Sequence, residues 1–213
     1  MLTIHHLERS QSERIIWLCE ELHLPYELKV YKRSPLLAPP ELQALHPSRS
    51  APIIQDGPVT LSESGAIFEY ILTKHNPTHA LTLPPTHPSY ANYLYFLHFA
   101  NGTFQPALLR YGLVIKNNLH LQEEGGGRFS AQLAIRGFER ALRILDERVR
   151  GNTWLAGEEF TAADVMMGFS LTTMRGWVEF GLEGWEGIKG YLGRVGEREG
   201  FRRMRIYTAS GEL

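Results

Sequence analysis

The pattern of hydrophobic and polar positions in the N-terminal part of the chain predicts alternating strands and helices. Residues 2–6 form a short strand, and the apolar side chains of residues 12–22 cluster on one side, as in a helix packed on a core. Residues 26–31 alternate apolar with polar side chains, which is the period of a half-buried strand. Two strands joined by one helix form a βαβ unit, so we expect them to pair in parallel.

The next part of the chain predicts a hairpin and a second helix. Asp56-Gly57 lies between the short apolar runs 53–54 and 59–60, and this dipeptide is typical of a tight hairpin turn. A proline-containing loop and a short helix over residues 41–45 precede the hairpin, and a helix over residues 61–72 follows it. The resulting order, βαβ followed by ββα, is that of a thioredoxin-like fold.

A change of composition separates this region from a second one. Residues 76–88 are rich in Pro, Thr, His and Asn and show little periodicity, which is typical of a linker. Beyond them the pattern is helical throughout: over residues 89–117, over 129–149 after a glycine run at 125–127, from residue 161, and in one or two shorter helices within 188–204. We therefore predict a thioredoxin-like domain over 1–78, a linker over 79–88 and an all-helical domain over 89–213.

Composition excludes several classes of function. The hydrophobic content of 43% is sufficient for a proper core, and a net charge of −1 gives no electrostatic reason to expect nucleic acid or an anionic membrane as a partner. No apolar run approaches the length of a membrane span, and the N-terminus lacks the apolar run of a signal peptide, so we expect a cytoplasmic protein. The nine histidines do not show metal-ligand spacing, and no metal is expected.

The start of the first helix carries the clearest candidate chemistry. Ser10 and Ser12 are alternative N-caps, and Glu13 follows Ser10 at the spacing of a capping box. A helix start favours an anion in front of it, although most such serines only cap the helix. A thioredoxin-like redox site normally has a cysteine here, but the single cysteine, Cys19, lies inside the helix as an expected core residue. A reacting thiol must then come from a ligand, which points to glutathione.

Several motifs in order extend this argument to a family. They are the segment Ser10-Gln11-Ser12-Glu13-Arg14, the segment Ala51-Pro52-Ile53-Ile54 before the hairpin, the pair Glu63-Ser64, the segment Thr161-Ala162-Ala163-Asp164, and residues 97–106. Each motif is weak alone, but together they resemble the cytosolic glutathione S-transferase family, in its serine-type, Gtt-like branch of fungi and bacteria. The resemblance implies a thioredoxin-like glutathione-binding domain followed by a helical domain.

The resemblance implies a catalytic role for one serine. The hydroxyl of Ser10, four residues before Arg14, would donate a hydrogen bond to the glutathione sulfur, and Ser12 is the alternative. A free thiol has a pKa of about 8.5, and lowering it by about two units requires about 2.7 kcal/mol, shared between the hydroxyl and the helix dipole. Arg14 is expected to be structural.

The remaining glutathione contacts are implied in the same way. Pro52 would be cis and would present the backbone of Ile53 to the cysteinyl part of glutathione as to an added strand; an ordinary trans loop proline is the alternative. Ser64 would receive the γ-glutamyl carboxylate at a helix start, and Glu63 would pair with the ammonium group; plain capping is the alternative.

One segment departs from the family pattern. The family usually has Pro-x-Gly followed by Lys or Arg before the cis-proline, and the basic residue reaches toward glutathione. Here Arg49 takes the glycine place and Ser50 the basic one. Either Arg49 turns to make the contact, or the contact is missing and glutathione binds less tightly.

The helical domain offers structural and pocket candidates. Thr161 and Asp164 have the spacing of a capping box with a structural role. The aromatic residues between positions 90 and 104 exceed what one buried face requires, so part of them could line an apolar pocket or a two-fold interface. The candidates for the second-substrate pocket are Leu7, Asn101, Gln105, Trp177 and Tyr207.

We therefore predict a homodimeric glutathione transferase that activates the glutathione thiolate for attack on a small apolar electrophile. The same thiolate could instead serve a cis–trans isomerase, or a peroxidase or disulfide reductase. A non-catalytic carrier or interaction module is the alternative of another class. The presence of Ser10, Pro52 and Ser64 argues against that module, whereas the altered segment at Arg49 leaves it open.

Overall fold

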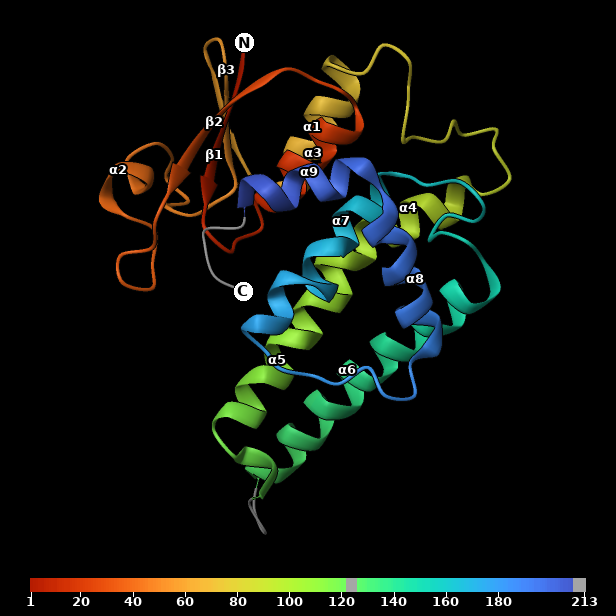
Figure 1. Ribbon diagram of the computed structural model, residues 1–213. Helices are drawn as coiled ribbons and strands as arrows, with labels where there is room; N and C mark the ends of the chain where they lie inside the picture. The colour runs from red at the N-terminus through yellow and green to blue at the C-terminus, as the bar shows by residue number, and fades with distance from the viewer. Residues whose placement is uncertain (122–125, 209–213) are drawn as a thin grey trace. The chain divides into compact units, whose positions relative to one another are not determined.

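The computed structural model describes residues 1–121 and 126–208 of the chain (Figure 1). Two compact units can be recognised: Met1–Pro84 together with the chain from Arg194 onward, and Pro85–Gly193. The last helix thus groups with the N-terminal unit, whereas the domain boundaries predicted from composition, 1–78 and 89–213, remain a prediction.

The N-terminal unit contains a mixed sheet of four strands. The strands are β1 (Leu2–Leu7), β2 (Tyr26–Tyr31), β3 (Ile53–Asp56) and β4 (Val59–Ser62), in the order β2-β1-β3-β4. β1 and β2 pair in parallel, while β3 is antiparallel to both β1 and β4. The expected βαβ crossover and hairpin are both confirmed, and the unit has the thioredoxin-like fold.

The register brings four chain segments to one end of this sheet. His5 of β1 is opposite Ile53, the first residue of β3, and Ile53 is opposite Ser62, the last residue of β4. At the same end, Leu7 closes β1 opposite Tyr31 of β2. The segments after β1, after β2, before β3 and after β4 therefore all leave or enter the sheet at this end.

Helices cover both faces of the sheet. In Figure 1, α1 (Glu13–Glu21) and α3 (Ser64–Lys74) lie on one side, and the short α2 (Pro40–Gln43) lies on the other. The helix predicted over residues 61–72 starts later than expected, because residues 61 and 62 complete β4. The last helix of the chain, α9 (Glu199–Thr208), packs against α1.

The packing of α9 explains why α1 is buried on more than one side. Its pattern predicted one apolar face, yet every residue from Glu13 to Cys19 is buried. The rings of Trp17 and Phe201 meet edge to face with centroids 5.0 Å apart, and Arg198 donates two hydrogen bonds to the carboxylate of Glu21 at 2.6 and 2.9 Å. The second buried side of α1 thus depends on a contact with a helix distant in sequence.

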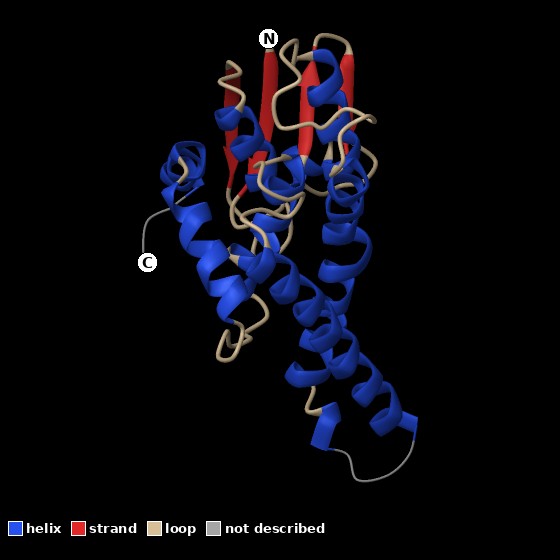
Figure 2. Cartoon of the chain, turned by 90° about the vertical axis from the view of Figure 1, so that its right-hand side faces the viewer, coloured by secondary structure: helices blue, strands red, loops and turns tan. Residues whose placement is uncertain are grey.

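The other unit is built from helices (Figure 2). Helix α4 packs against α7, and α5 packs against α6. Every residue of α7 is buried, which makes it the central helix of this unit. The glycine break expected at 125–127 falls partly outside the described residues. The elements are α4 (Tyr90–Phe99), the π-helical turn η1 (Ala100–Phe104), α5 (Gln105–Lys116), η2 (Leu119–Leu121), α6 (Gly126–Gly151), α7 (Ala162–Leu171), η3 (Thr173–Gly176) and α8 (Glu186–Glu197), whose end lies beyond Gly193.

None of the helices in the described ranges is both long and apolar enough to cross a membrane.

Candidate functional site

The loop between β1 and α1 carries two serine side chains in direct contact. Ser10 Oγ and Ser12 Oγ are 2.7 Å apart, and the backbone N–H of Ser12 also donates to Ser10 Oγ at 3.3 Å. Ser12 holds the N-cap position of α1, one of the two predicted alternatives, but makes no side-chain capping bond to any residue that the structure describes. Ser12 is fully buried, whereas Ser10 is 7% exposed. Ser10 is therefore the member of the pair nearer to solvent.

A histidine completes this group. His6 Nδ1 lies 2.8 Å from Ser12 Oγ, and the imidazole is fully buried in β1. Burial, with a smaller contribution from the positive charge of Arg33, lowers the pKa of His6 to about 4, so the ring is neutral near pH 7. The spacing of the histidines along the chain bears only on metal binding and gives no role to His6. No sequence pattern singled out His6, because its burial in β1 and its contact with Ser12 exist only in the folded chain.

Two arginines support the loop from either side. Arg33 donates from Nε to the carbonyl of Glu8 and from Nη2 to the carbonyl of Arg9, both at 3.0 Å. Arg14, predicted to be structural, is 1% exposed and donates from Nη1 to Gln11 Oε1 at 2.7 Å. Burial lowers the pKa of Arg14 to about 9. The bonds of Arg33 hold the backbone just before Ser10, and the bond of Arg14 holds the Gln11 side chain just after it.

The buried His6 predicts a loss of stability in acid. Its pKa is about 4 in the folded protein and 6.5 in the unfolded chain. Because the folded pKa is the lower one, the contribution of His6 is present above pH 6.5 and is lost as the pH falls toward 4. We expect about 3 kcal/mol of the free energy of unfolding to be lost across this window. Urea unfolding of the wild type and of the His6→Asn variant at several pH values measures it.

The comparison of the wild type with the His6→Asn variant separates the contribution of His6 from those of the other titrating groups. Burial raises the pKa of Asp164 to about 6, so that carboxyl adds stability as the pH falls, and it does so equally in both proteins. The wild type should lose stability relative to His6→Asn on acidification. Parallel curves would show that His6 is protonated as easily in the folded protein as in the unfolded chain.

The segment before β3 has the conformation that the resemblance implies. The Ala51–Pro52 peptide bond is cis, which confirms that expectation. Ser62 Oγ donates to the carbonyl of Pro52 at 3.0 Å and holds the segment against the end of β4. Ile53 is fully buried and has a strand on each side. Backbone groups open to a further peptide strand would therefore belong to the residues just before Ile53.

Glu63 and Ser64 stand where β4 passes into α3. Glu63 is exposed and has a φ of 75°, an uncommon backbone conformation for a residue other than glycine. Ser64 is the first residue of α3 and is 3% exposed. By the register of the sheet, this helix start, cis Pro52 and the Ser10 loop lie at the same end of the sheet.

The conformation of Arg49 agrees with its place in the family pattern. Its φ of 53° is in the left-handed region that favours glycine, the residue the family usually has there. The side chain is exposed, and its Nε donates to Gln43 Oε1 of α2 at 2.9 Å. Arg49 thus fills the glycine place in backbone terms, and its contact with glutathione remains a prediction.

The predicted second-substrate residues do not form one group. Leu7 is 4% exposed and packs in a core cluster with Ala38, Leu42 and Ile53. Asn101 and Gln105 are partly buried positions of the helical unit, four residues apart across the π-helical turn, and Trp177 of the same unit is 43% exposed. Tyr207 belongs to α9 in the N-terminal unit.

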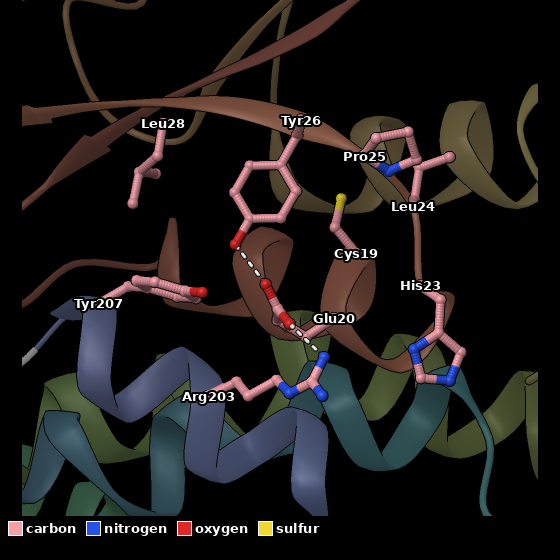
Figure 3. Close-up of a pocket in the computed structure, with 9 residues that line it drawn as sticks. All are labelled: Cys19, Glu20, His23, Leu24, Pro25, Tyr26, Leu28, Arg203 and Tyr207. Carbon is pink, nitrogen blue, oxygen red and sulfur yellow. Dashed lines mark hydrogen bonds and ion pairs between the residues drawn. The ribbon is translucent and has the colours of Figure 1, made fainter.

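Tyr207 lines a pocket of its own (Figure 3). The pocket has a volume of about 470 Å³. Inside it, Tyr26 donates to Glu20 Oε1 at 2.6 Å, and Arg203 Nη1 lies 3.8 Å from Glu20 Oε2. The described residues that line it do not include Ser10, so it is separate from the serine pair. The lining residues are Cys19, Glu20, His23, Leu24, Pro25, Tyr26, Leu28, Arg203 and Tyr207.

The protein's own thiol is inert in this fold. Cys19 is a fully buried free cysteine, as expected of a core residue, and burial raises the pKa of its thiol. Within the described ranges, no group of three or more His, Cys, Asp or Glu side chains could hold a metal ion. The polar groups at this end of the sheet include the hydroxyls of Ser10 and Ser64 and the start of α3, and a helix start favours a bound anion.

Comparison with known proteins identifies the family. Residues 9–74 match the family model of the glutathione S-transferase N-terminal domain, and residues 126–199 match that of the C-terminal domain. Glutathione S-transferase 3 of Schizosaccharomyces pombe is 34% identical over 182 residues, which cover 80% of this chain and 73% of that protein. The chain belongs to the glutathione S-transferase family.

Other members of the glutathione S-transferase family agree with this assignment. Glutathione S-transferase 1 of Saccharomyces cerevisiae is 27% identical over 188 residues, covering 80% of each chain. A crystal structure of a glutathione S-transferase from Actinobacillus pleuropneumoniae is 31% identical, with a TM-score of 0.86 over 99% of this chain and 94% of that one. A family member from Pseudomonas fluorescens, solved with two glutathione bound, has a TM-score of 0.74 at 23% identity, over 95% of this chain and 91% of that one.

Proposed function

We propose that this glutathione S-transferase activates the thiol of glutathione at Ser10 and adds the thiolate to a small apolar electrophile. The observation that carries the proposal is the position of Ser10. It stands before α1 at one end of the sheet, where two hydroxyls and a helix start come together and the chain has no cysteine of its own. The sulfur that reacts there belongs to the ligand.

Ser10 would act by stabilising the thiolate over the thiol. A hydrogen bond from a hydroxyl to a charged acceptor contributes about 1.5–3 kcal/mol. The positive end of the α1 dipole contributes about 0.3–1 kcal/mol more. Together these terms lower the pKa of a thiol from about 8.5 to near neutral pH, because one pKa unit corresponds to about 1.4 kcal/mol. A thiolate of this kind is a strong nucleophile at physiological pH.

The rest of glutathione would bind at the same end of the sheet. The N-terminus of α3, with Ser64 as its first residue, offers N–H donors to the γ-glutamyl carboxylate, and Glu63 offers a carboxylate to the ammonium group. The cysteinyl part would pair with the backbone just before Ile53. Glutathione bound to the Pseudomonas fluorescens relative supports glutathione as the co-substrate here.

Product analysis tests the reaction. The protein is incubated with glutathione and a panel of aryl halides, enones, conjugated cis-alkenes and hydroperoxides. A conjugate mass supports the proposed transfer. Isomerised product without glutathione consumption would indicate a cis–trans isomerase instead, and oxidised glutathione would indicate a peroxidase or reductase. Folded protein that fails to bind glutathione in titration calorimetry would favour a non-catalytic module.

Replacing Ser64 with alanine is expected to weaken glutathione binding about 10- to 100-fold. The variant removes a hydroxyl that would bond a carboxylate, and such a bond contributes about 1.5–3 kcal/mol. Titration calorimetry with glutathione measures the change. Thr73→Ala is the control, because it removes an exposed hydroxyl at the other end of the same helix. Equal affinities of the two variants would contradict a ligand role for Ser64 and leave it as a helix cap.

The homodimer expected of the family is part of the same proposal. The helical unit exposes large apolar side chains on three of its helices, namely Tyr95 on α4, Leu109 and Leu113 on α5, and Phe129 and Leu133 on α6. Exposed apolar residues on neighbouring helices suit an interface with a second copy of the chain.

A further inference from the structure

His6, Ser12 and Ser10 form a chain of two hydrogen bonds whose last member, Ser10, is the nearest to solvent. His6 Nδ1 and Ser12 Oγ are 2.8 Å apart, and Ser12 Oγ and Ser10 Oγ are 2.7 Å apart. His6 and Ser12 are fully buried, whereas Ser10 is 7% exposed. Each hydroxyl has a single hydrogen, so a chain in which the buried Ser12 hydrogen has an acceptor runs either outward, from His6 to Ser10, or inward. The direction decides where the hydrogen of Ser10 points.

The second nitrogen of His6 decides the direction. His6 Nε2 is buried and has no hydrogen-bond partner in the described part of the chain. The ring is neutral near pH 7, so one nitrogen carries a hydrogen and the other is bare. A buried N–H without an acceptor is rarer in proteins than an acceptor that is not fully used. The hydrogen therefore belongs on Nδ1, where Ser12 Oγ accepts it.

The remaining hydrogens follow from this one. Once Ser12 Oγ accepts from His6, its own hydrogen has Ser10 Oγ as its acceptor among the described residues. Ser10 Oγ also accepts the backbone N–H of Ser12 at 3.3 Å. Both acceptor positions of the Ser10 oxygen are then used. The hydrogen of Ser10 then has no acceptor within this group, so it is available to an acceptor on the side of Ser10 that solvent reaches.

We propose that His6 and Ser12 are positioning residues, which act on a bound thiolate only through Ser10. His6 donates a hydrogen bond to Ser12, and Ser12 donates one to Ser10, so the hydrogen of Ser10 is held outward. This inference rests on the proposed role of Ser10. It also assigns different tasks to the two serines, since Ser12 is committed to the chain and Ser10 contacts the sulfur. Successive donation polarises each hydroxyl and strengthens the last donor of the chain.

The sign of the change in the pKa of bound glutathione tests the direction of the hydrogen-bond chain. In the Ser12→Ala variant, an outward chain loses its polarising donor, and the pKa of bound glutathione should rise by about half a unit to one unit. An inward chain would instead hold the Ser10 hydrogen on Ser12, so the same variant would free it and lower the thiol pKa. The ultraviolet absorbance of the thiolate, titrated against pH in the complex, measures this pKa. A lowered or unchanged pKa in Ser12→Ala overturns the proposal.

Variants of His6 test the inner end of the chain. His6→Leu should raise the thiol pKa as Ser12→Ala does, and the double variant should raise it no further, because both changes interrupt one chain. In His6→Asn an amide N–H can take the place of Nδ1–H, so the pKa should stay near the wild-type value. The KM for glutathione should change little in all of these variants, while kcat below the thiol pKa falls only in those whose thiol pKa rises. If His6→Leu does not fold, Ser12→Ala and His6→Asn still decide the question.

The matched control is the neighbouring histidine. His5 is 1% exposed in the same strand, but its ring nitrogens bond Tyr31 and Gln55 rather than a serine. His5→Asn should leave the thiol pKa unchanged, and a rise equal to that of His6→Leu would assign the effect to general disturbance of β1.

Failure of the proposed function gives a result that differs from failure of this inference. If Ser10→Ala leaves the thiol pKa unchanged, Ser10 has no role at the sulfur, whatever Ser12→Ala does.

Discussion

Replacing Ser10 with alanine is expected to raise the pKa of enzyme-bound glutathione by about one to two units, because the hydrogen bond lost is one to a charged sulfur. At a pH below that pKa, the thiolate fraction falls in the same proportion, so kcat/KM should drop about 10- to 100-fold. The thiolate absorbance of the complex and the rate of conjugation with an aryl halide, both followed against pH, measure the two effects. At high pH the rates of the variant and the wild type should converge.

Ser10→Thr is the control for this prediction. It keeps the hydroxyl and should keep most of the activity. Ser10→Ala should also remain folded, since Ser10 is at the surface end of its hydrogen-bonded group. An unchanged thiol pKa and an unchanged rate in Ser10→Ala would exclude Ser10 as the donor. If Ser12→Ala then carried the full loss, the other serine would be the donor.

Local patterns predicted the elements that local chemistry controls. The hairpin follows from Asp56-Gly57, where Gly57 has a φ of 60° that suits a tight turn. The helix start at Thr161 follows from a capping box that the structure contains. The parallel pairing of β1 and β2 follows from the βαβ order. Each signal lies within a few residues of the feature it predicts.

Contacts between distant parts of the chain had no such signal. The burial of the second side of α1 comes from α9, which is more than 170 residues further along. Nothing in the sequence of residues 12–22 predicts that α9 packs against this helix. The same limit applies to Tyr207, whose pocket is formed by residues of α1, β2 and the segment between them. Periodicity states which residues are buried, but not what covers them.

The candidate site divides in the same way. Ser10, Pro52 and Ser64 were found because family motifs mark them. His6 was not, because its importance depends on a 2.8 Å contact with Ser12 that exists only after β1 and α1 have packed. Arg49 is a third case. Its sequence departs from the family pattern, which has glycine at this place, and its backbone φ of 53° supports the alignment of Arg49 with that glycine.

The largest loss of stability is expected in the helical unit, from replacing Asp164 with alanine. Its carboxylate is fully buried and accepts the backbone N–H groups of Leu155 and Thr161, both at 2.9 Å. It also accepts the hydroxyls of Thr161 and Tyr191, both at 3.2 Å. The single side chain thus ties the start of α7 to the preceding turn and to α8.

The cost of the substitution follows from the donors it leaves behind. Each buried donor without an acceptor costs about 1–3 kcal/mol, so losing the acceptor for two backbone N–H groups and two hydroxyls should cost at least about 4 kcal/mol. For a protein of this size, this corresponds to a fall in Tm of roughly 10 °C or more. Thermal unfolding followed by circular dichroism measures it. Conjugating activity at low temperature should persist in whatever fraction of the variant remains folded.

Asp164→Asn separates the hydrogen bonds of Asp164 from its charge, and Glu158→Ala is the control. Asp164→Asn keeps one acceptor oxygen but turns an N–H₂ group toward the donors on the other side, so its loss should be large and still smaller than that of Asp164→Ala. Glu158→Ala removes an exposed carboxylate from the same region, one that accepts only the Thr153 hydroxyl among the described contacts, and should change stability by less than about 0.5 kcal/mol. If Asp164→Ala were no worse than Glu158→Ala, the buried carboxylate would not be what holds the start of α7. The losses of stability in Asp164→Ala and Asp164→Asn should also appear without glutathione, because Asp164 stabilises the fold before any substrate is bound.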